Sequence, residues 1–190
     1  MDKVFVTNGC SSHSTKERQS KDYYATPFIA TEKLLTVEKF SENIYEPFVG
    51  GGHISMVLEK NGYKVRNSDI VDRGYHDTEI IDFLNCNDEP IDADIISNPP
   101  YKYVLECWQK ACERITEGHK VAFMLKLTFL EGKARKELFK KYPPSRLHVF
   151  SERITCAMNG EFEKYHSSAI AHGWFVYEKG NKNNPVVDWI

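Results

Sequence analysis

The sequence predicts an α/β fold in which helices cover both faces of an open, doubly wound and mostly parallel sheet. Apolar strand-like segments alternate with helical segments, and the connections between them are short. One connection, residues 46–52, is a glycine-rich turn of the kind that links a strand to a helix. After residue 145 two strand-like segments follow each other without a helix, which indicates an antiparallel C-terminal strand pair.

Local patterns place the individual elements. The expected strands cover residues 43–48, 63–68, 79–83, 93–97, 121–127, 146–155 and 168–177. The expected helices begin near residue 28 and then cover residues 54–60, 104–116 and 129–141. In the first helix we expect Thr26 as the cap and Pro27 as the first residue. Its apolar face would consist of Phe28, Ile29, Leu34 and Leu35.

The bulk composition is that of one soluble globular domain. The chain has 190 residues, of which 41% are hydrophobic and 27% charged, and its net charge of −2 leaves room only for a local basic face. The five cysteines contain no C-x-x-C pair, which argues against a disulfide framework or a metal site. No apolar run is long enough for a membrane span or a signal peptide. We expect a cytoplasmic protein without membrane or metal, with a flexible segment at residues 1–22 and a single domain at 23–190.

The most informative motif is Asn98-Pro99-Pro100-Tyr101, which directly follows the strand expected at residues 93–97. The side-chain oxygen of Asn98 and the carbonyl of Pro99 are two acceptors that would bind the hydrogens of an aromatic amine. The two prolines restrict the backbone and preorganise these acceptors. Tyr101 offers a flat face on which a base would stack. The motif therefore indicates chemistry at an amino or amide nitrogen.

The glycine-rich turn predicts a cofactor site. Gly50 and Gly52 permit a tight turn before a helix, and Asp69 follows the next strand at a distance suited to ribose hydroxyls. The turn is not a dinucleotide fingerprint, because the third glycine position is Ser55. Asp82 and Phe83 would bracket an adenine, although the pair taken alone favours a solvated aspartate beside a core phenylalanine.

Two further segments are candidates for substrate contact. Seven basic residues face only two acidic ones between residues 126 and 146, and they would hold phosphates or form a solvated helix face. They are Lys126, Lys133, Arg135, Lys136, Lys140, Lys141 and Arg146. The aromatic loop at residues 158–166 would cover a base or be a hairpin tip. We expect His53 to line the cofactor turn and not to react.

From residue 23 to 179 these motifs resemble the S-adenosylmethionine-dependent amino-methyltransferases, especially small phage-type DNA adenine-N6 enzymes with an N-P-P-Y motif. The resemblance implies a Rossmann-like class I methyltransferase fold and S-adenosylmethionine as cofactor. It assigns cofactor binding to Tyr24, Thr26, Pro27, Glu46, Phe48, Gly50, Gly52, Asp69, Ile70, Asp82, Phe83 and Asn98. It assigns catalysis to Asn98, Pro99, Pro100 and Tyr101, and we add Tyr101, Lys126, Lys133, Arg135 and Lys136 as substrate contacts.

One departure from the family concerns target recognition. Only 45 residues separate Gly52 from Asn98 (98 − 52 − 1), which leaves no room for a separate target-recognition domain. Sequence selection would then be weak, come from loops, or be supplied by a protein partner or a homodimer.

The sequence thus predicts a methyltransferase acting on the N6 amine of adenine, with DNA favoured over RNA. The alternatives are an RNA adenine enzyme, a protein glutamine enzyme, and a binding module that catalyses little.

Overall fold

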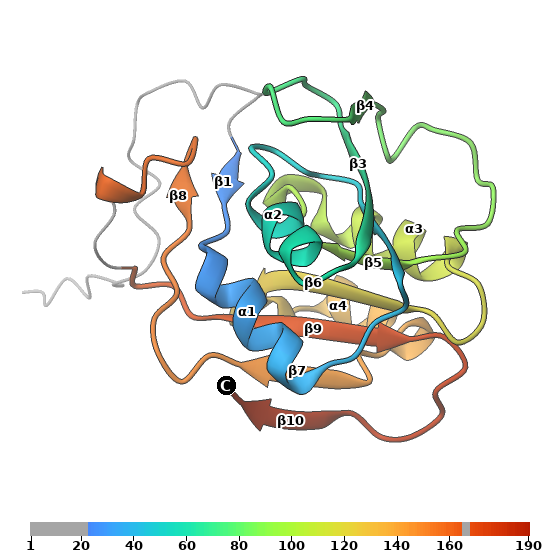
Figure 1. Cartoon of the computed structure of the whole chain (residues 1–190). Coiled ribbons are helices and arrows are strands. Elements are labelled where there is room, and N and C mark those ends of the chain that lie inside the picture. Colours follow the sequence, from blue (N-terminus) through green and yellow to red (C-terminus); the bar gives the residue numbers. More distant parts are fainter. Residues whose placement is uncertain (1–22, 165–167) are drawn as a thin grey trace, which may run out of the picture.

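A computed structural model of the chain describes residues 23–164 and 168–190, so the predicted flexible segment at residues 1–22 lies outside the described residues. The main strands are β2 (Asn43–Glu46), β3 (Lys64–Asp69), β4 (Thr78–Ile80), β5 (Asp94–Ser97), β6 (Lys120–Lys126), β7 (Arg146–Val149), β9 (His172–Glu178) and β10 (Val186–Trp189). They form one sheet in the order β10-β7-β9-β6-β5-β2-β3-β4 (Figure 1). β9 runs antiparallel to both of its neighbours, and every other pair is parallel. The predicted mostly parallel sheet with a C-terminal antiparallel pair is confirmed.

Two helices cover each face of this sheet. The helices α1 (Phe28–Val37) and α2 (His53–Lys60) pack on one face, and α3 (Val104–Arg114) and α4 (Lys133–Lys141) pack on the other (Figure 1). The side chains of strand β6 show why both faces of the sheet are buried. Ala122 and Met124 join the core under α1 and α2, whereas Phe123 and its two alternate neighbours join the core under α3. The doubly wound architecture follows from this continuous apolar strand.

The chain reverses its direction of travel across the sheet after β4. From β2 it moves outward to β3 and β4, and it then returns to place β5 on the other side of β2. In open sheets of this type, ligands bind at the carboxyl ends of the strands beside such a switch point. The segments that follow β2 and β5 are the glycine turn and the Asn-Pro-Pro-Tyr loop, so the fold places both predicted motifs there.

The first helix differs from its prediction in two ways. Thr26 does not cap it, and Pro27 stands before the helix and not at its first position. Phe28 and Ile29 are 47% and 48% exposed, so they do not belong to the buried face. The helix begins only at Phe28, and this register turns Ala30, Thr31 and Leu34 toward the sheet.

Three other elements are shorter than predicted. The basic helix begins at Lys133 and not at residue 129, because Gly132 (φ 109°) separates α4 from a 3₁₀ turn, η2 (Leu127–Leu130). β4 ends at Ile80, and the Asp82 carboxylate then accepts the N–H groups of Leu84 and Asn85, which closes a turn. β7 ends at Val149.

Two small features were not predicted. β10 pairs in parallel with β7 at the edge of the sheet, and a separate ribbon joins β1 (Tyr24–Ala25) to β8 (Ala157–Met158). In the described part of the chain, no helix combines the length and apolarity that crossing a membrane requires.

Candidate active site

The sheet order brings four predicted segments to one edge. β5, β2, β3 and β4 are consecutive and parallel, so the residues that follow their carboxyl ends are neighbours. These residues are the Asn98 loop, the glycine turn, Asp69 and Asp82. The structure therefore brings the predicted cofactor residues and catalytic residues together.

The glycine turn is stabilised by the carboxylate of Asp69. Gly50 donates its N–H to Asp69 Oδ2 at 2.9 Å, and Asp69 Oδ1 accepts the N–H of Val71 at 3.1 Å. Gly50 (φ 55°) and Gly52 (φ 81°) have left-handed backbones that favour glycine. Asp69 thus supports the turn itself, and its contact with a ribose stays a prediction.

Two tyrosine rings press against this turn. Tyr23 belongs to the segment at residues 22–27 that the family resemblance places at the methionine part of the cofactor, whereas sequence reasoning did not assign Tyr75 to the site. A Cβ atom at Gly50 would lie 2.7 Å from the ring of Tyr23, and one at Gly52 would overlap the ring of Tyr75. Tyr75 is held in place because its hydroxyl donates to Glu59 Oε2 at 2.9 Å. The glycines are therefore required by close side-chain packing as well as by their φ angles.

Beneath the turn, Glu46 forms part of a buried hydrogen-bonded chain. It is 1% exposed and contacts the hydroxyl of Ser55, which also lies 2.6 Å from Asn67 Oδ1. Burial raises the pKa of Glu46 well above its ordinary value, and the hydrogen bonds with Ser55 oppose this shift. The Ser55 hydroxyl donates to Glu46 Oε2 and lies within hydrogen-bond distance of the Asn67 amide, so one side chain contacts both neighbours. Ser55, the residue in the place of a third glycine, is thus a structural link.

On the adenine side, the structure separates Asp82 from Phe83. The ring of Phe83 is 2% exposed and packs edge-on against Phe48, with ring centroids 5.3 Å apart. A contact between this ring and an adenine would require it to leave the core. The Asp82 carboxylate is used by its own turn, and its hydrogen bond to Asn85 lowers its pKa. Ile70 is 63% exposed at the end of β3 and remains available for contact.

The side-chain amide of Asn98 is held in one orientation, and its buried oxygen makes no hydrogen bond with any described residue. Its Nδ2 donates to the Tyr24 carbonyl at 3.0 Å and to Thr26 Oγ1 at 3.1 Å. A backbone carbonyl is only an acceptor, so this contact determines which end of the amide faces it. Asn98 Oδ1 is buried and has no hydrogen-bond partner among the described residues. Tyr24 and Thr26, predicted to hold the cofactor, are therefore the residues that orient Asn98.

Tyr101 lies in a crowded environment. Its hydroxyl is 3.3 Å from His172 Nε2, and the Nζ atom of Lys126 lies 4.2 Å from the centre of its ring. The ring of Tyr24 is also close, at a centroid distance of 6.0 Å. Burial, followed by the nearby Lys126, lowers the pKa of His172 to about 4, so its imidazole is neutral at pH 7. No local sequence pattern points to His172 as a residue of the site, because its contact with Tyr101 spans 71 residues.

The segment after β8 lies over the glycine turn. The ring of Phe162 contacts that of His53 at 5.4 Å, and a Cβ at Gly160 would lie 3.2 Å from the Tyr23 hydroxyl. Burial lowers the pKa of His53, which agrees with a neutral residue that lines the turn. The described part of the aromatic loop at residues 158–166 therefore covers the cofactor side. Residues 165 and 166 lie outside the described residues.

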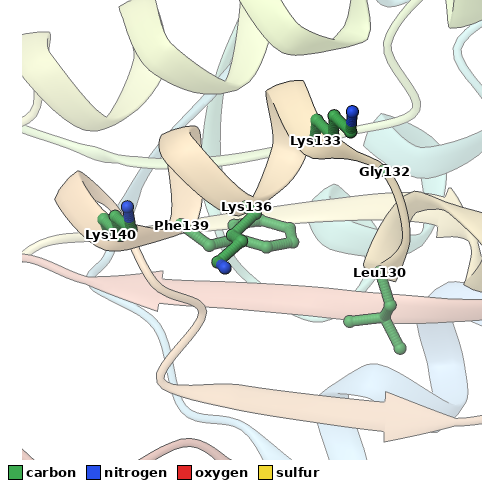
Figure 2. Close-up of a pocket in the computed structure, with 6 residues that line it drawn as sticks. All are labelled: Leu130, Gly132, Lys133, Lys136, Phe139 and Lys140. Atoms are coloured by element: carbon green, nitrogen blue, oxygen red, sulfur yellow. The ribbon is translucent and has the colours of Figure 1, made fainter.

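The basic residues of the predicted segment do not form one continuous surface. Lys126 lies at Tyr101, and Lys133 and Lys136 are exposed on α4 (Figure 2). Arg135 is directed elsewhere, because its Nη1 donates to the Glu131 and Thr128 carbonyls and its guanidinium lies over Phe129. Arg146 bonds to Glu38 and Glu178 at the opposite end of the sheet and is not part of the site.

Comparison with solved structures identifies the fold. A protein from Listeria monocytogenes assigned to the class I S-adenosylmethionine-dependent methyltransferases matches with a TM-score of 0.59 and 15% identity, covering 87% of this chain and 65% of that one. A modification subunit assigned to a type I restriction enzyme of Vibrio vulnificus matches with a TM-score of 0.62 and 11% identity, and the match covers 91% of this chain and 48% of that one. A protein from Pyrococcus horikoshii assigned as an RNA methyltransferase matches with a TM-score of 0.52 and 14% identity, and the match covers 80% of each chain.

The chain thus spans less than two thirds of the length of the first two of these proteins. No protein-family model matches the sequence, and no curated protein matches it. At these identities the likeness concerns the fold alone, and that fold is the Rossmann-like fold of class I methyltransferases.

Proposed function

We propose that this chain is an S-adenosylmethionine-dependent methyltransferase that methylates the exocyclic N6 amine of adenine, with DNA as the favoured substrate. The observation that supports the proposal is the buried, unpartnered Oδ1 of Asn98. Its position next to Tyr101, at the switch point of a methyltransferase fold, suits an acceptor for an N–H of a stacked base.

The residues of the site fit this cofactor. A glycine turn opens the helix α2, and the Asp69 carboxylate lies beside it at the end of the next strand. Gly50, Gly52 and Asp69 would hold the nucleoside part of S-adenosylmethionine, with Asn98 facing its reactive end. The cofactor would supply an electrophilic methyl group.

What the chain itself supplies is orientation of the amine. The lone pair of an aromatic amine is delocalised into the ring, so the amine is a weak nucleophile. An acceptor that binds one of its hydrogens favours the pyramidal form, in which the lone pair is localised on nitrogen. Asn98 Oδ1 is suited to this role because its orientation is fixed before substrate arrives.

The substrate class is argued from the fold relatives and from the chemistry of the acceptor. Among the fold relatives are a restriction-modification subunit and a protein assigned as an RNA methyltransferase, which agrees with a nucleic-acid substrate of either kind. A glutamine side-chain amide presents a similar NH₂ group, so a protein substrate is a second candidate for the same acceptor.

The test is transfer of labelled methyl groups from S-adenosylmethionine to duplex DNA, single-stranded DNA, RNA and protein in parallel. The product is identified by mass spectrometry after digestion, with Asn98→Ala as the matched control. We expect N6-methyladenine from DNA with the wild-type protein only. N6-methyladenine from RNA alone, or methylglutamine from protein, would replace the DNA assignment. Absence of transfer to all four would overturn the proposal and favour a binding module.

A further inference from the structure

Beside the active site, the surface between η2 and α4 contains a hollow with a volume of about 670 Å³. Its lining comprises Leu130, Gly132, Lys133, Lys136, Phe139 and Lys140 (Figure 2). The proposed chemistry makes no use of the apolar residues of this hollow.

The floor of the hollow is apolar and firmly anchored. The ring of Phe139 packs edge-on against Phe129, with centroids 5.4 Å apart, and against Trp108, with centroids 6.2 Å apart. Both of these partners are buried in the core, so the floor cannot easily move. Leu130 is 49% exposed at the opposite side of the hollow. This pair of side chains presents an apolar surface of the kind that a base face can cover.

The rim of the hollow is cationic. α4 carries five basic residues and one acidic residue, on a chain whose net charge is −2. Among the described residues, no carboxylate lies within 4.0 Å of the ammonium group of Lys133 or Lys136. Lys140 pairs with Glu137 at 2.8 Å, but both side chains are well exposed, so this ion pair is weak and exchangeable. Phosphate groups complement this rim.

The hollow is close to Tyr101 along the chain. η2 begins directly after Lys126, whose ammonium lies over the Tyr101 ring. A 3₁₀ turn rises about 2 Å per residue, so its four residues span about 8 Å. The hollow is thus near enough to Tyr101 to receive a nucleotide that flanks the target base.

We propose that this hollow is a second base-binding subsite, which rests on the proposed function. It holds an unpaired nucleotide that flanks the target, with the base against Leu130 and Phe139 and its phosphates on Lys133 and Lys136. A duplex offers the same phosphates but keeps its base faces stacked, so the apolar floor favours a strand that is unpaired beside the target.

The test measures binding of a labelled oligothymidylate that contains one adenine, by fluorescence anisotropy. In companion oligonucleotides, an abasic residue replaces one nucleotide at a time around the adenine. We expect the wild-type Kd to rise about tenfold at one flanking position, the size of one stacking contact. Leu130→Ser should weaken binding of the intact oligonucleotide about as much, and should remove the penalty of the abasic residue.

Charge is tested separately. Lys136→Gln should weaken every oligonucleotide alike and reduce the salt dependence of binding by roughly one phosphate contact. Lys182→Gln is the matched control, because Lys182 is exposed in the β9–β10 connection at the other end of the sheet. It should bind as the wild type does.

Equal tolerance of abasic residues at every position, or wild-type binding by Leu130→Ser, would overturn the subsite. Methyl transfer to nucleic acid is read in its own assay, so the two proposals fail separately. If the wild-type protein transfers methyl groups to nucleic acid but Leu130→Ser binds the oligonucleotides as the wild type does, only the subsite is overturned. If the wild-type protein transfers no methyl group to any nucleic acid, the proposed function is overturned.

Discussion

Asn98 owes its orientation to two residues that lie more than 70 positions earlier in the chain. The carbonyl of Tyr24 and the hydroxyl of Thr26 both accept from its Nδ2, which leaves Oδ1 as the acceptor for substrate. A buried acceptor without a partner costs free energy in the folded protein. Such a cost is expected at a site that binds a donor during its reaction.

Replacement of Asn98 by alanine should therefore lower turnover by about 10²-fold or more, comparable to loss of one transition-state hydrogen-bonding group. Affinity for the cofactor, measured by calorimetry, should change little. Turnover within a few-fold of the wild type would remove Asn98 from the chemistry.

Thr26 gives a matched pair of variants for the orientation itself. Thr26→Ser keeps the hydroxyl that Asn98 contacts, whereas Thr26→Val keeps the shape and loses it. We expect Thr26→Val to lower turnover more than Thr26→Ser, with little change in KM. Equal effects would mean that Thr26 acts through packing only.

At Tyr101, the ring and the hydroxyl have separate roles. Tyr101→Ala should weaken use of the target base by about 1–3 kcal/mol, the contribution of a stacked ring. Tyr101→Phe should be milder, because the ring face remains and only the contacts of the hydroxyl are lost, among them those with His172 and Cys156. His172→Phe in the Tyr101→Phe background should add little to kcat/KM if His172 acts through that hydroxyl. Fully additive losses would show that His172 acts elsewhere.

At the scale of an element, the glycine turn combines backbone strain with close packing. Gly52 (φ 81°) faces the Tyr75 ring, whereas Gly74 (φ 80°) has nothing within 4 Å of an added Cβ. The two glycines thus have the same backbone conformation in different surroundings. Substitution at both separates the cost of conformation from the cost of packing.

We expect Gly74→Ala to lose about 1 kcal/mol of stability from backbone strain. Gly52→Ala should lose that amount plus about 1–3 kcal/mol from overpacking, and should weaken cofactor binding. Urea denaturation and calorimetry measure the two effects. Equal destabilisation by both variants would mean that Tyr75 moves away without cost.

The ribbon of β1 and β8 connects the two halves of the site. Asn159 donates its N–H to the Tyr23 carbonyl at 2.9 Å, next to the Tyr24 carbonyl that orients Asn98. The cofactor turn, the catalytic loop and the covering segment therefore share one short ribbon. Its two strands, at residues 24–25 and 157–158, come from opposite ends of the sequence.

At the scale of the whole molecule, a buried charge cluster joins α1 to the far end of the sheet. Glu38 is 5% exposed and contacts Arg146, His148 and Lys120. These hydrogen bonds outweigh the desolvation of its carboxylate and lower the pKa of Glu38 to about 2. The cluster faces away from the active site, so its role is structural.

Acid should therefore destabilise the protein in two windows. The pKa of Glu38 falls from 4.5 to about 2 on folding, so its contribution is complete above pH 4.5 and is lost between pH 4.5 and 2. The pKa of His172 falls from 6.5 to about 4, so the unfolded chain binds more protons between these values, and stability decreases as pH falls from 6.5 to 4.

Denaturant unfolding at a series of pH values measures both losses. Glu38→Gln should be less stable at pH 7 and should show a smaller decline than the wild type between pH 4.5 and 2, because Asp82 and other carboxylates with lowered pKa values still titrate there. His172→Gln should show a smaller decline between pH 6.5 and 4, where His53 still contributes. A variant that keeps the slope of the wild type would exclude that residue as the group that titrates.

The sequence by itself determined the fold class, the order of its strands and helices, and the placement of Gly50, Asp69 and Asn98 after their strands. These features follow from local patterns, because the hydrophobic periods of strands and helices and the chemistry of turns are written into neighbouring residues. Where an element ends depended on less regular causes. Gly132 and the Asp82 carboxylate, for example, each shortened a predicted element.

Only the tertiary structure decided which polar side chains are available to contact a substrate. Arg135 and Arg146 read as phosphate-binding residues in the sequence, yet one bonds to nearby carbonyls and the other to a buried glutamate. The orientation of Asn98 and the contact of His172 with Tyr101 likewise depend on residues more than 70 positions apart. Contacts between residues so far apart produce no local pattern in a sequence, because the two partners come close only when the chain between them has folded.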